Sequence, residues 1–287
     1  EGTLDIQILS GIAGGAATTS FWNTDGGSES FADWAIGVLA SADPPLVHSV
    51  SYDDYEEQDS EEFMRRGDIE FMKAGVRGLT ILFASGDYGT GCNMSTLPAK
   101  FAPEWPPTSP YVTAVGGTAL QGDTEVAWPM GGGGFAFAHT QPGYQAAAVA
   151  EYLRTAHALP DAALFNSSNR GFPDVSALAT NYAIVLNGQV STVSGTSAST
   201  PTWAAIVTLL NDARREKGIA PLGFLNPFLY ANAKRGFHDV TVGANDAYTC
   251  FTGDGFSAAV GWDPATGLGS PNFPALLAAA TNASTQR

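Results

Sequence analysis

One serine in the segment SGTSAST, residues 194–200, has the surroundings of a nucleophile. Gly195 lets the backbone turn sharply, and the stretch that follows Pro201 has the residue pattern of a helix. Ser197 would then lie at the start of that helix, where free backbone N–H groups can bind an anion. Ser197 is therefore a candidate nucleophile, and the next question is which group accepts its proton.

The histidines offer Ser197 no obvious base. The chain has four of them; none stands at an HGT-type helix start, and no Asp–strand–His pair precedes the serine as in subtilisin. We therefore expect each to be structural or exposed to solvent: His48, His139, His157 and His238.

Two carboxyl groups near the beginning of the chain are the alternative. Glu1 and Asp5 are four residues apart, so a helix would project both from one face. Neighbouring like charges raise the pKa of one carboxyl group, which then holds a proton while the other is ionised. The spacing is common, however, and by itself it also describes a solvated helix face.

The surrounding elements place these residues on an α/β fold. Apolar strands are predicted at 46–53, 79–87, 111–120 and 182–189, and a helix at 60–78. Apolar strands that alternate with helices indicate a parallel sheet covered by helices, with the chemistry in loops at the carboxyl ends of the strands. Asp87 and Ser197 follow that rule. The segment 129–145, which contains GGGGF, is predicted to be irregular surface.

Composition excludes several classes of function. The 287 residues include 28 acidic and 13 basic ones, a formal net charge of −15, which argues against nucleic acid and anionic membranes as partners. No run of 18 apolar residues predicts a membrane span. Cys92 and Cys250 could form a disulfide or be two unrelated buried thiols. Sequons at Asn93, Asn166 and Asn282 favour secretion weakly.

Taken together, the motifs resemble the sedolisin family of serine-carboxyl peptidases, in particular its tripeptidyl-peptidase members and their fungal relatives. The motifs are SGTSAST, FASGDYGTGC, Glu1 with Asp5, TSPYVTAVGGT (108–118), GFPDVSALA (171–179), PLGFLNPFLY (221–230) and the region 237–277. The resemblance runs from residue 1 to about residue 280. It implies a subtilisin-like α/β fold, a twisted parallel sheet flanked by helices.

The resemblance also assigns roles. It implies Ser197 as nucleophile, Glu1 as general base, Asp5 as its proton-sharing partner, and Asp87 as the carboxyl group of the oxyanion hole. A protonated Asp87 can donate a hydrogen bond to the oxyanion, and a carboxylate with a raised pKa can act as base in acid, where histidine is protonated. Asp54 corresponds to an acidic position that contacts substrate or supports the catalytic carboxyls; a surface turn is the alternative.

A calcium site near the C-terminus is a further implication. Two carboxylates with main-chain carbonyls suit this hard cation. The resemblance assigns side-chain ligation to Asp239 and Asp263, and carbonyl ligation to Val240, Ala259 and Gly261. It also favours a Cys92–Cys250 disulfide.

The predicted function is an acid-acting serine-carboxyl peptidase that releases tripeptides from free N-termini. The alternatives are an endopeptidase of the same family and a non-catalytic binding protein on the same scaffold. Residues 1–287 would be the catalytic domain without its N-terminal part and propeptide, and we expect that N-terminal segment to be needed. The expected location is outside the cell or in an acidic lysosome-like or vacuole-like compartment.

Overall fold

The computed structural model describes residues 1–24, 30–156, 158–251 and 253–282. The helices are α1 (Gly2–Ala13), α2 (Ser30–Ala40), η1 (Glu56–Gln58, a 3-10 turn), α3 (Glu61–Val76), α4 (Ala146–Thr155), α5 (Thr196–Glu216), α6 (Asn226–Ala231) and α7 (Phe273–Ala280). The strands are β1 (Val47–Val50), β2 (Asp54–Tyr55), β3 (Thr80–Ala84), β4 (Glu104–Trp105), β5 (Thr113–Gln121), β6 (Thr124–Ala127), β7 (Gly134–Thr140), β8 (Asn169–Phe172), β9 (Val175–Leu178), β10 (Tyr182–Leu186), β11 (Gln189–Val193), β12 (Phe237–His238) and β13 (Ser270–Pro271).

A mostly parallel sheet lies at the centre of the molecule. Its order is β1-β3-β5, with β9 and β6 both paired to β5; β1, β3, β5 and β9 run parallel, and only β6 is antiparallel. Every residue of β3 is buried, as the apolar run in this part of the sequence predicts. The predicted α/β architecture is therefore confirmed.

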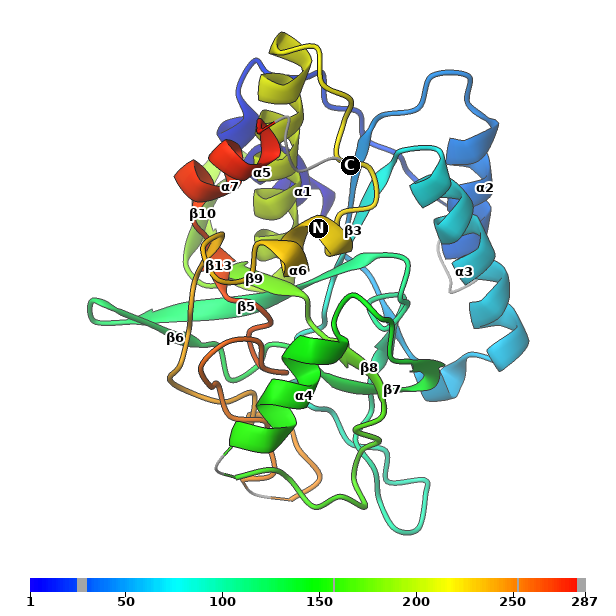
Figure 1. Ribbon diagram of the computed structural model, residues 1–287, viewed down its shortest axis with the longest axis vertical. Helices are drawn as coiled ribbons and strands as arrows, with labels where there is room; N and C mark the ends of the chain where they lie inside the picture. The colour runs from blue at the N-terminus through cyan, green and yellow to red at the C-terminus, as the bar shows by residue number, and fades with distance from the viewer. Residues whose placement is uncertain (25–29, 157, 252, 283–287) are drawn as a thin grey trace.

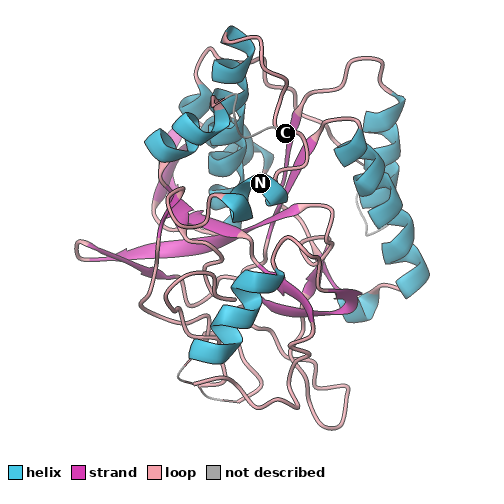
Figure 2. Ribbon diagram, viewed as in Figure 1, coloured by secondary structure: helices cyan, strands magenta, loops and turns pink. Residues whose placement is uncertain are grey.

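Helices cover both sides of this sheet. The α2 and α3 helices lie on one side, at the right of Figure 1, while α1, α5 and α7 lie on the other (Figures 1 and 2). The larger hydrophobic core surrounds α5 and includes Trp203, Val207 and Leu210, and a second core joins α2 and α3 to the sheet. Burial of apolar surface on both sides holds the strand ends in fixed positions.

The lower part of Figure 1 contains β7, β8, α4 and long loops. Here the prediction of irregular surface for 129–145 was wrong, because most of residues 131–136 are buried and β7 pairs with β8. Gly132 explains the misreading: a Cβ there would lie 1.8 Å from the carbonyl oxygen of Ser85, so glycine allows close backbone packing at the end of β3.

The segment 182–189 also differs from its prediction. It forms a separate antiparallel hairpin, β10 with β11, instead of a strand of the parallel sheet. Asn187 and Gly188, both with positive φ, supply the two-residue turn.

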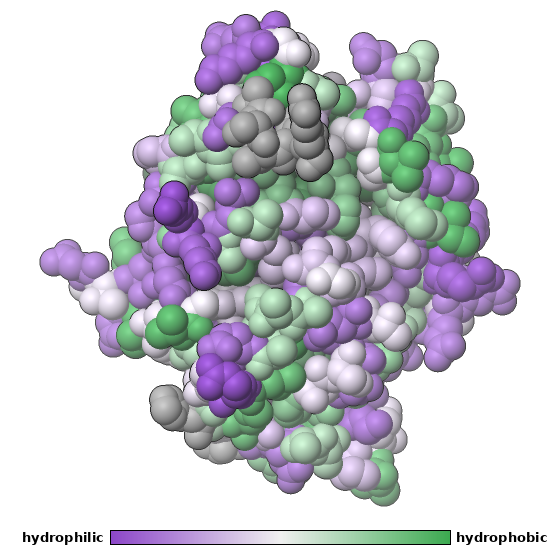
Figure 3. Space-filling model, in the orientation of Figure 1, coloured by the Kyte–Doolittle hydropathy of each residue, from purple (hydrophilic) through white to green (hydrophobic). Residues whose placement is uncertain are grey.

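The surface reflects the acidic composition. On the face in Figure 3, hydrophilic residues gather at the tip of the β5–β6 hairpin and along the helices at the right. None of the described helices is long and apolar enough to cross a membrane.

Candidate active site

The carboxyl ends of β1 and β3 meet the beginning of α5. Ser51 directly follows β1, Asp87 lies three residues after β3, and Ser197 is the second residue of α5. The N-terminus of α5 is held against β9, because the Ser199 hydroxyl donates hydrogen bonds to the carbonyls of Ala177 and Leu178, each at 3.0 Å. The predicted helix with Ser197 at its beginning is therefore confirmed.

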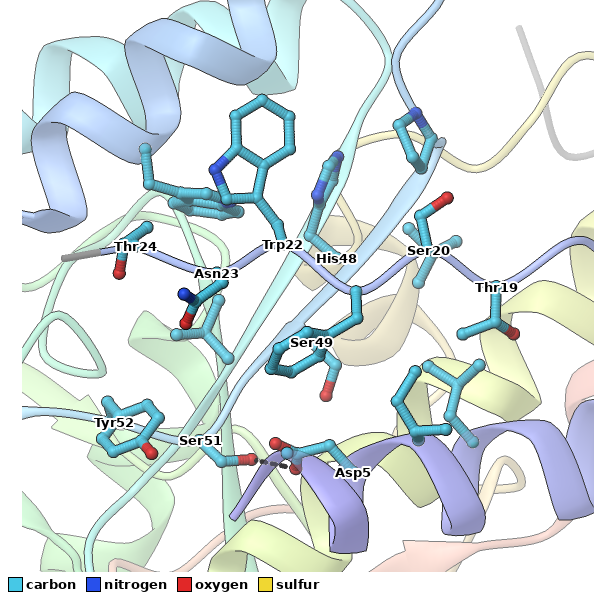
Figure 4. A pocket seen from close by; sticks show the side chains of 18 of the residues that line it. Asp5, Thr19, Ser20, Trp22, Asn23, Thr24, His48, Ser49, Ser51 and Tyr52 are labelled. Carbon is cyan, nitrogen blue, oxygen red and sulfur yellow. Dashed lines mark hydrogen bonds between the residues drawn. The ribbon is translucent and has the colours of Figure 1, made fainter. Parts of the chain in front are cut away.

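Asp5 is connected to the nucleophile segment through Ser51. Residues 2–13 form α1, as the spacing of Glu1 and Asp5 allowed, and α1 packs along α5. The Ser51 hydroxyl donates a 2.7 Å hydrogen bond to Asp5 Oδ1 and lies 3.5 Å from the Ser197 carbonyl oxygen (Figure 4). That carbonyl is available because residue 201 is proline, which has no N–H for the usual helical bond.

The pKa of Asp5 is raised to about 6. Burial is the main cause; the hydrogen bond from Ser51 lowers the pKa, and the nearby charge of Glu1 raises it. Glu1 is exposed and forms the N-cap position of α1. Within the described ranges, neither Glu1 nor Asp5 hydrogen-bonds to the Ser197 hydroxyl, so the structure brings the two carboxyls together but does not itself link Glu1 to Ser197.

Asp87 lies on the other side of the nucleophile segment. Its Oδ1 accepts hydrogen bonds of 2.8 Å from both the N–H and the hydroxyl of Thr196. Its Oδ2 lies 2.8 Å from the point where a Cβ on Gly195 would stand, and Ser197 Cβ lies 3.6 Å from that same point. Glycine at 195 therefore lets the carboxyl group approach Ser197.

The two carboxyl oxygens of Asp87 have different surroundings, and this affects where a proton can reside. Burial raises the pKa of Asp87, while the two hydrogen bonds from Thr196 lower it. Because Oδ1 is an acceptor for Thr196, a proton on this carboxyl group would reside on Oδ2, the oxygen that faces Gly195. A protonated Oδ2 can donate to an oxyanion formed at Ser197.

The described histidines make their side-chain contacts with residues other than Ser197, Asp5 and Asp87. His139 is buried between Asp68 and Glu56, and His48 packs edge-on against Trp34. Both are structural, as predicted, and His238 is exposed. His157 lies outside the described residues.

A pocket of about 490 Å³ opens beside these groups. It is bounded by α1, by residues 18–24 and by the chain from Pro45 to Asp54, and Asp5 lies at its edge. Figure 4 shows Trp22 beside His48 on one side and Ser51 with Asp5 on the other. Of the four predicted catalytic residues, Asp5 alone lines this pocket.

Comparisons with known proteins agree with this geometry. The chain is 44% identical to tripeptidyl-peptidase 1 of the dog (Canis lupus familiaris) over 291 residues, 97% of this chain and 51% of that protein. It is 43% identical to human (Homo sapiens) tripeptidyl-peptidase 1 over 96% of this chain and 51% of that protein. The chain thus spans about half the length of the curated relatives it matches.

A solved structure shows the same architecture. A Pseudomonas sedolisin, a serine-carboxyl proteinase complexed with two molecules of pseudo-iodotyrostatin, matches with a TM-score of 0.72 at 24% identity, covering 96% of this chain and 77% of that one. The chain is a relative of tripeptidyl-peptidase 1 with the sedolisin fold. The resemblance predicted from the motifs is thereby confirmed, although no family model matches the chain.

In this sedolisin-fold chain, the two carboxylates predicted to bind calcium both bond to the segment 259–261. Asp239 Oδ2 accepts a 2.9 Å hydrogen bond from Gly261 N–H, and Asp263 Oδ2 accepts one of 2.9 Å from Ala259 N–H. Asp263 is fully buried, and no cationic side chain of the described ranges pairs with either carboxylate. Carboxylates and main-chain carbonyls, such as that of Val240, are the ligand types that a hard cation takes.

Only two of the predicted calcium ligands are side chains, Asp239 and Asp263. In the described part of the chain, no group of three or more His, Cys, Asp or Glu residues could hold a metal ion. The disulfide, by contrast, is present: Cys92 and Cys250 are bonded across 158 residues of sequence.

The sequence did not predict three residues that lie beside the proposed catalytic carboxyl groups. Thr196 and Ser51 hold the two predicted carboxyls, and Glu104 lies buried beside Asp53, Asp54 and Asp87. Glu104 could have been suspected, because it is a single acid in the otherwise apolar stretch FAPEWPP. Asp54 itself lies in β2, where its charge acts on Asp53 and Glu104.

Proposed function

We propose that this protein is an acid-acting serine peptidase whose nucleophile is Ser197. The observation that carries the proposal is the position of Ser197 at the beginning of α5, with two carboxyl groups of raised pKa, Asp5 and Asp87, on either side. At acid pH a carboxylate can serve as base where an imidazole cannot, because the imidazole is already protonated.

The reaction is an acyl transfer in two halves. Ser197 Oγ attacks the peptide carbonyl carbon and gives its proton to the Glu1 carboxylate, whose charge is supported by sharing a proton with Asp5. The oxyanion accepts hydrogen bonds from protonated Asp87 Oδ2 and from backbone N–H at the start of α5. Glu1 then gives the proton to the departing amine, which leaves an ester on Ser197.

Water completes the cycle. It attacks the ester carbonyl, Glu1 accepts the water proton, and collapse of the second tetrahedral intermediate returns a proton to Ser197 Oγ and frees the carboxylic acid. Activity therefore requires that Asp87 keep its proton while the Glu1 and Asp5 pair has lost one. We expect the rate to fall as pH rises through the raised pKa of Asp87.

Substitution of Ser197 by alanine tests this proposal. In full-length protein at pH 3–5, Ser197→Ala should lower kcat by about 10⁴-fold or more, since it removes the attacking atom. Ser257→Ala, at an exposed serine outside the site, is the control. Equal activity of the Ser197→Ala variant and the unchanged protein would contradict the proposal.

We propose release of tripeptides from free N-termini as the substrate preference, supported by the similarity to tripeptidyl-peptidase 1. Peptides with free and with acetylated N-termini separate this from an endopeptidase. Cleavage of both sets at equal rates would favour the endopeptidase.

We further propose that Asp239 and Asp263 bind one calcium ion, which would stabilise the loop 259–263. The full-length protein should lose thermal stability in a chelator and regain it with calcium, and Asp239→Asn should abolish the difference. A Tm that is unchanged by chelator would contradict this proposal.

The acid requirement supports a secreted or lysosome-like or vacuole-like location. Of the three sequons, Asn166 and Asn282 are exposed and Asn93 is partly buried, so all three are candidates for glycosylation in such a location. Mass spectrometry of the secreted protein, with and without an N-glycosidase, tests this.

A preceding segment of the same protein is a proposed partner of β1. In the described sheet β1 is an end strand, and the side chains of His48 and Ser49 each have a buried polar atom without a partner. Hydrogen exchange of the full-length protein should show protection of the amides of residues 47–50 on both edges of β1.

A further inference from the structure

Glu104 is buried with its carboxyl group directed toward the active site. It is only 6% exposed and lies in β4, which pairs with β2 so that Glu104 stands opposite Tyr55. Side chains of consecutive strand residues point to opposite faces. Trp105 occupies the core face, within the aromatic cluster of α2 and α3, so Glu104 points the other way.

Gly86 makes room for this carboxyl group. A Cβ on Gly86 would lie 1.5 Å from Glu104 Oε2, and Gly86 has a φ of +101°, so only glycine suits this position. Gly86 immediately precedes Asp87. The Glu104 carboxyl group therefore lies directly behind the residue that we propose to hold the oxyanion.

No cation or hydrogen-bond donor satisfies Glu104. Among the described residues, no Lys, Arg or His pairs with it and no N–H or O–H group donates to it. The titratable groups that face it are Asp53, Asp54, Asp87 and Tyr55. A side chain this deeply buried normally has a partner, and its absence points to one that the substrate supplies.

We propose that Glu104, with Asp53 beside it, selects a cationic side chain on the substrate residue whose carbonyl Ser197 attacks. This inference rests on the proposed peptidase function and adds its side-chain preference. A guanidinium or ammonium group is the counter-ion that Glu104 and Asp53 lack among the described residues, and charge-assisted hydrogen bonds to a carboxylate are the strong ones.

Selection should depend on pH in a defined direction. Burial and then the charges of Asp87 and Asp54 raise the pKa of Asp53 to about 7, and burial with the charges of Asp53, Asp87 and Asp54 raises that of Glu104 well above its ordinary value. In acid the pair therefore holds protons. A bound cation favours the ionised form, so binding releases a proton and becomes stronger as pH rises.

Arginine and its neutral isostere citrulline provide the test. The substrates Ala-Ala-Arg and Ala-Ala-citrulline, each linked to a coumarin amide, are compared by kcat/KM between pH 3 and 5.5 with the full-length protein. We expect arginine to be favoured by about 10- to 100-fold at pH 5.5, the range of one charge-assisted hydrogen bond. The preference should shrink toward pH 3.

Variants locate the preference. Glu104→Gln should reduce the arginine-to-citrulline ratio to within about threefold of one, and Asp53→Asn should reduce it partly. Glu57→Gln, an exposed acid on the neighbouring η1, is the matched control and should retain the ratio. A ratio near one in the unchanged protein at every pH, or a full ratio in both Glu104→Gln and Asp53→Asn, would overturn the proposal.

Direct binding separates this inference from the peptidase proposal. Calorimetry of the free tripeptides Ala-Ala-Arg and Ala-Ala-citrulline with the full-length protein needs neither turnover nor a variant. Tighter binding of the arginine peptide with release of a proton supports the proposed role of Glu104 and Asp53 even if no substrate is cleaved. Equal binding of the two peptides overturns it even if the citrulline substrate is hydrolysed and Ser197→Ala is inactive.

Discussion

Two regions of the molecule bury carboxyl groups in opposite ways. In the core, Arg170 and Asp174 are both fully buried and form a 2.6 Å ion pair, and Asp174 also accepts hydrogen bonds from Ala114 N–H and the Tyr230 hydroxyl. Along the carboxyl ends of β1 and β3, by contrast, Asp53, Asp87 and Glu104 act on one another through their charges, and no Lys, Arg or His in the described part of the chain pairs with them.

The difference teaches what each region is built to do. A carboxyl group that is compensated inside the protein holds elements together, as Asp174 does through Arg170, Ala114 and Tyr230. A carboxyl group that is buried without compensation holds a proton or awaits a cation, and both properties are useful to chemistry in acid. His139 belongs to the compensated type, since it lies 2.7 Å from Asp68 and 3.3 Å from Glu56.

The largest effect is expected from breaking the compensated pair. Asp174→Asn leaves Arg170 buried without a counter-ion and should lower the free energy of unfolding by about 3–5 kcal/mol, measured by urea denaturation. Asp33→Asn, which breaks an exposed pair with Arg66, is the control and should change it by less than about 1 kcal/mol. Similar losses in the two variants would remove the distinction between the regions.

Asp87 tests the uncompensated region through activity. Asp87→Ala removes the proposed oxyanion donor and should lower kcat by about 10²- to 10³-fold without lowering the free energy of unfolding. Asp87→Asn should retain more activity, because its amide oxygen can accept from Thr196 while its NH₂ donates in the place of Oδ2.

The pH dependence of kcat in the Asp87→Asn variant provides a second test of the role of Asp87. An amide does not titrate, so the fall in kcat with rising pH that is due to Asp87 should disappear. If Asp87→Asn is as inactive as Asp87→Ala, a hydrogen-bond donor at this position is not sufficient, and the proposed role of Asp87 is incomplete.

The smallest effect is expected in the pH dependence of stability. The pKa of Asp53 is raised to about 7. The contribution of this group to the free energy of unfolding is therefore fully present below about pH 4, and it is lost as pH rises to 7. For His139, burial lowers the pKa but the bonds to Asp68 and Glu56 raise it to about 9. Its contribution is therefore present below about pH 6.5 and is lost as pH rises through 9.

Two variants separate these windows. Asp53→Asn should flatten the stability profile between pH 4 and 7, and His139→Gln should flatten it between pH 6.5 and 9, both followed by urea denaturation. If Asp53→Asn changes only the alkaline window, or His139→Gln only the acid one, the assignment of the two regions is reversed.

Local sequence predicted the parts of the site that lie on single elements. The helix that begins beside Ser197, the helix that carries Glu1 and Asp5, and the buried strand before Asp87 are all present, because period, turn residues and apolar runs are properties of neighbouring residues. The sedolisin fold followed from motifs spread along the chain.

Predictions failed where a segment depends on distant partners. Residues 129–145 were predicted to be irregular surface, yet the glycines of this segment pack against Ser85 and Pro264 and lead into β7. The hairpin β10–β11 likewise depends on its contacts with α1, where Gln7 bonds to Val185. Nothing in the local pattern specifies such neighbours.

By itself, then, the sequence supplied the candidate groups, Ser197, Glu1, Asp5 and Asp87, and argued against histidine as the base. Only the tertiary structure decided which carboxyls lie together and which lack a cation. Glu104 and Asp53 are 51 residues apart in the chain. They lie close together because β2 pairs with β4. Their burial and the charges of the neighbouring carboxyl groups raise both pKa values.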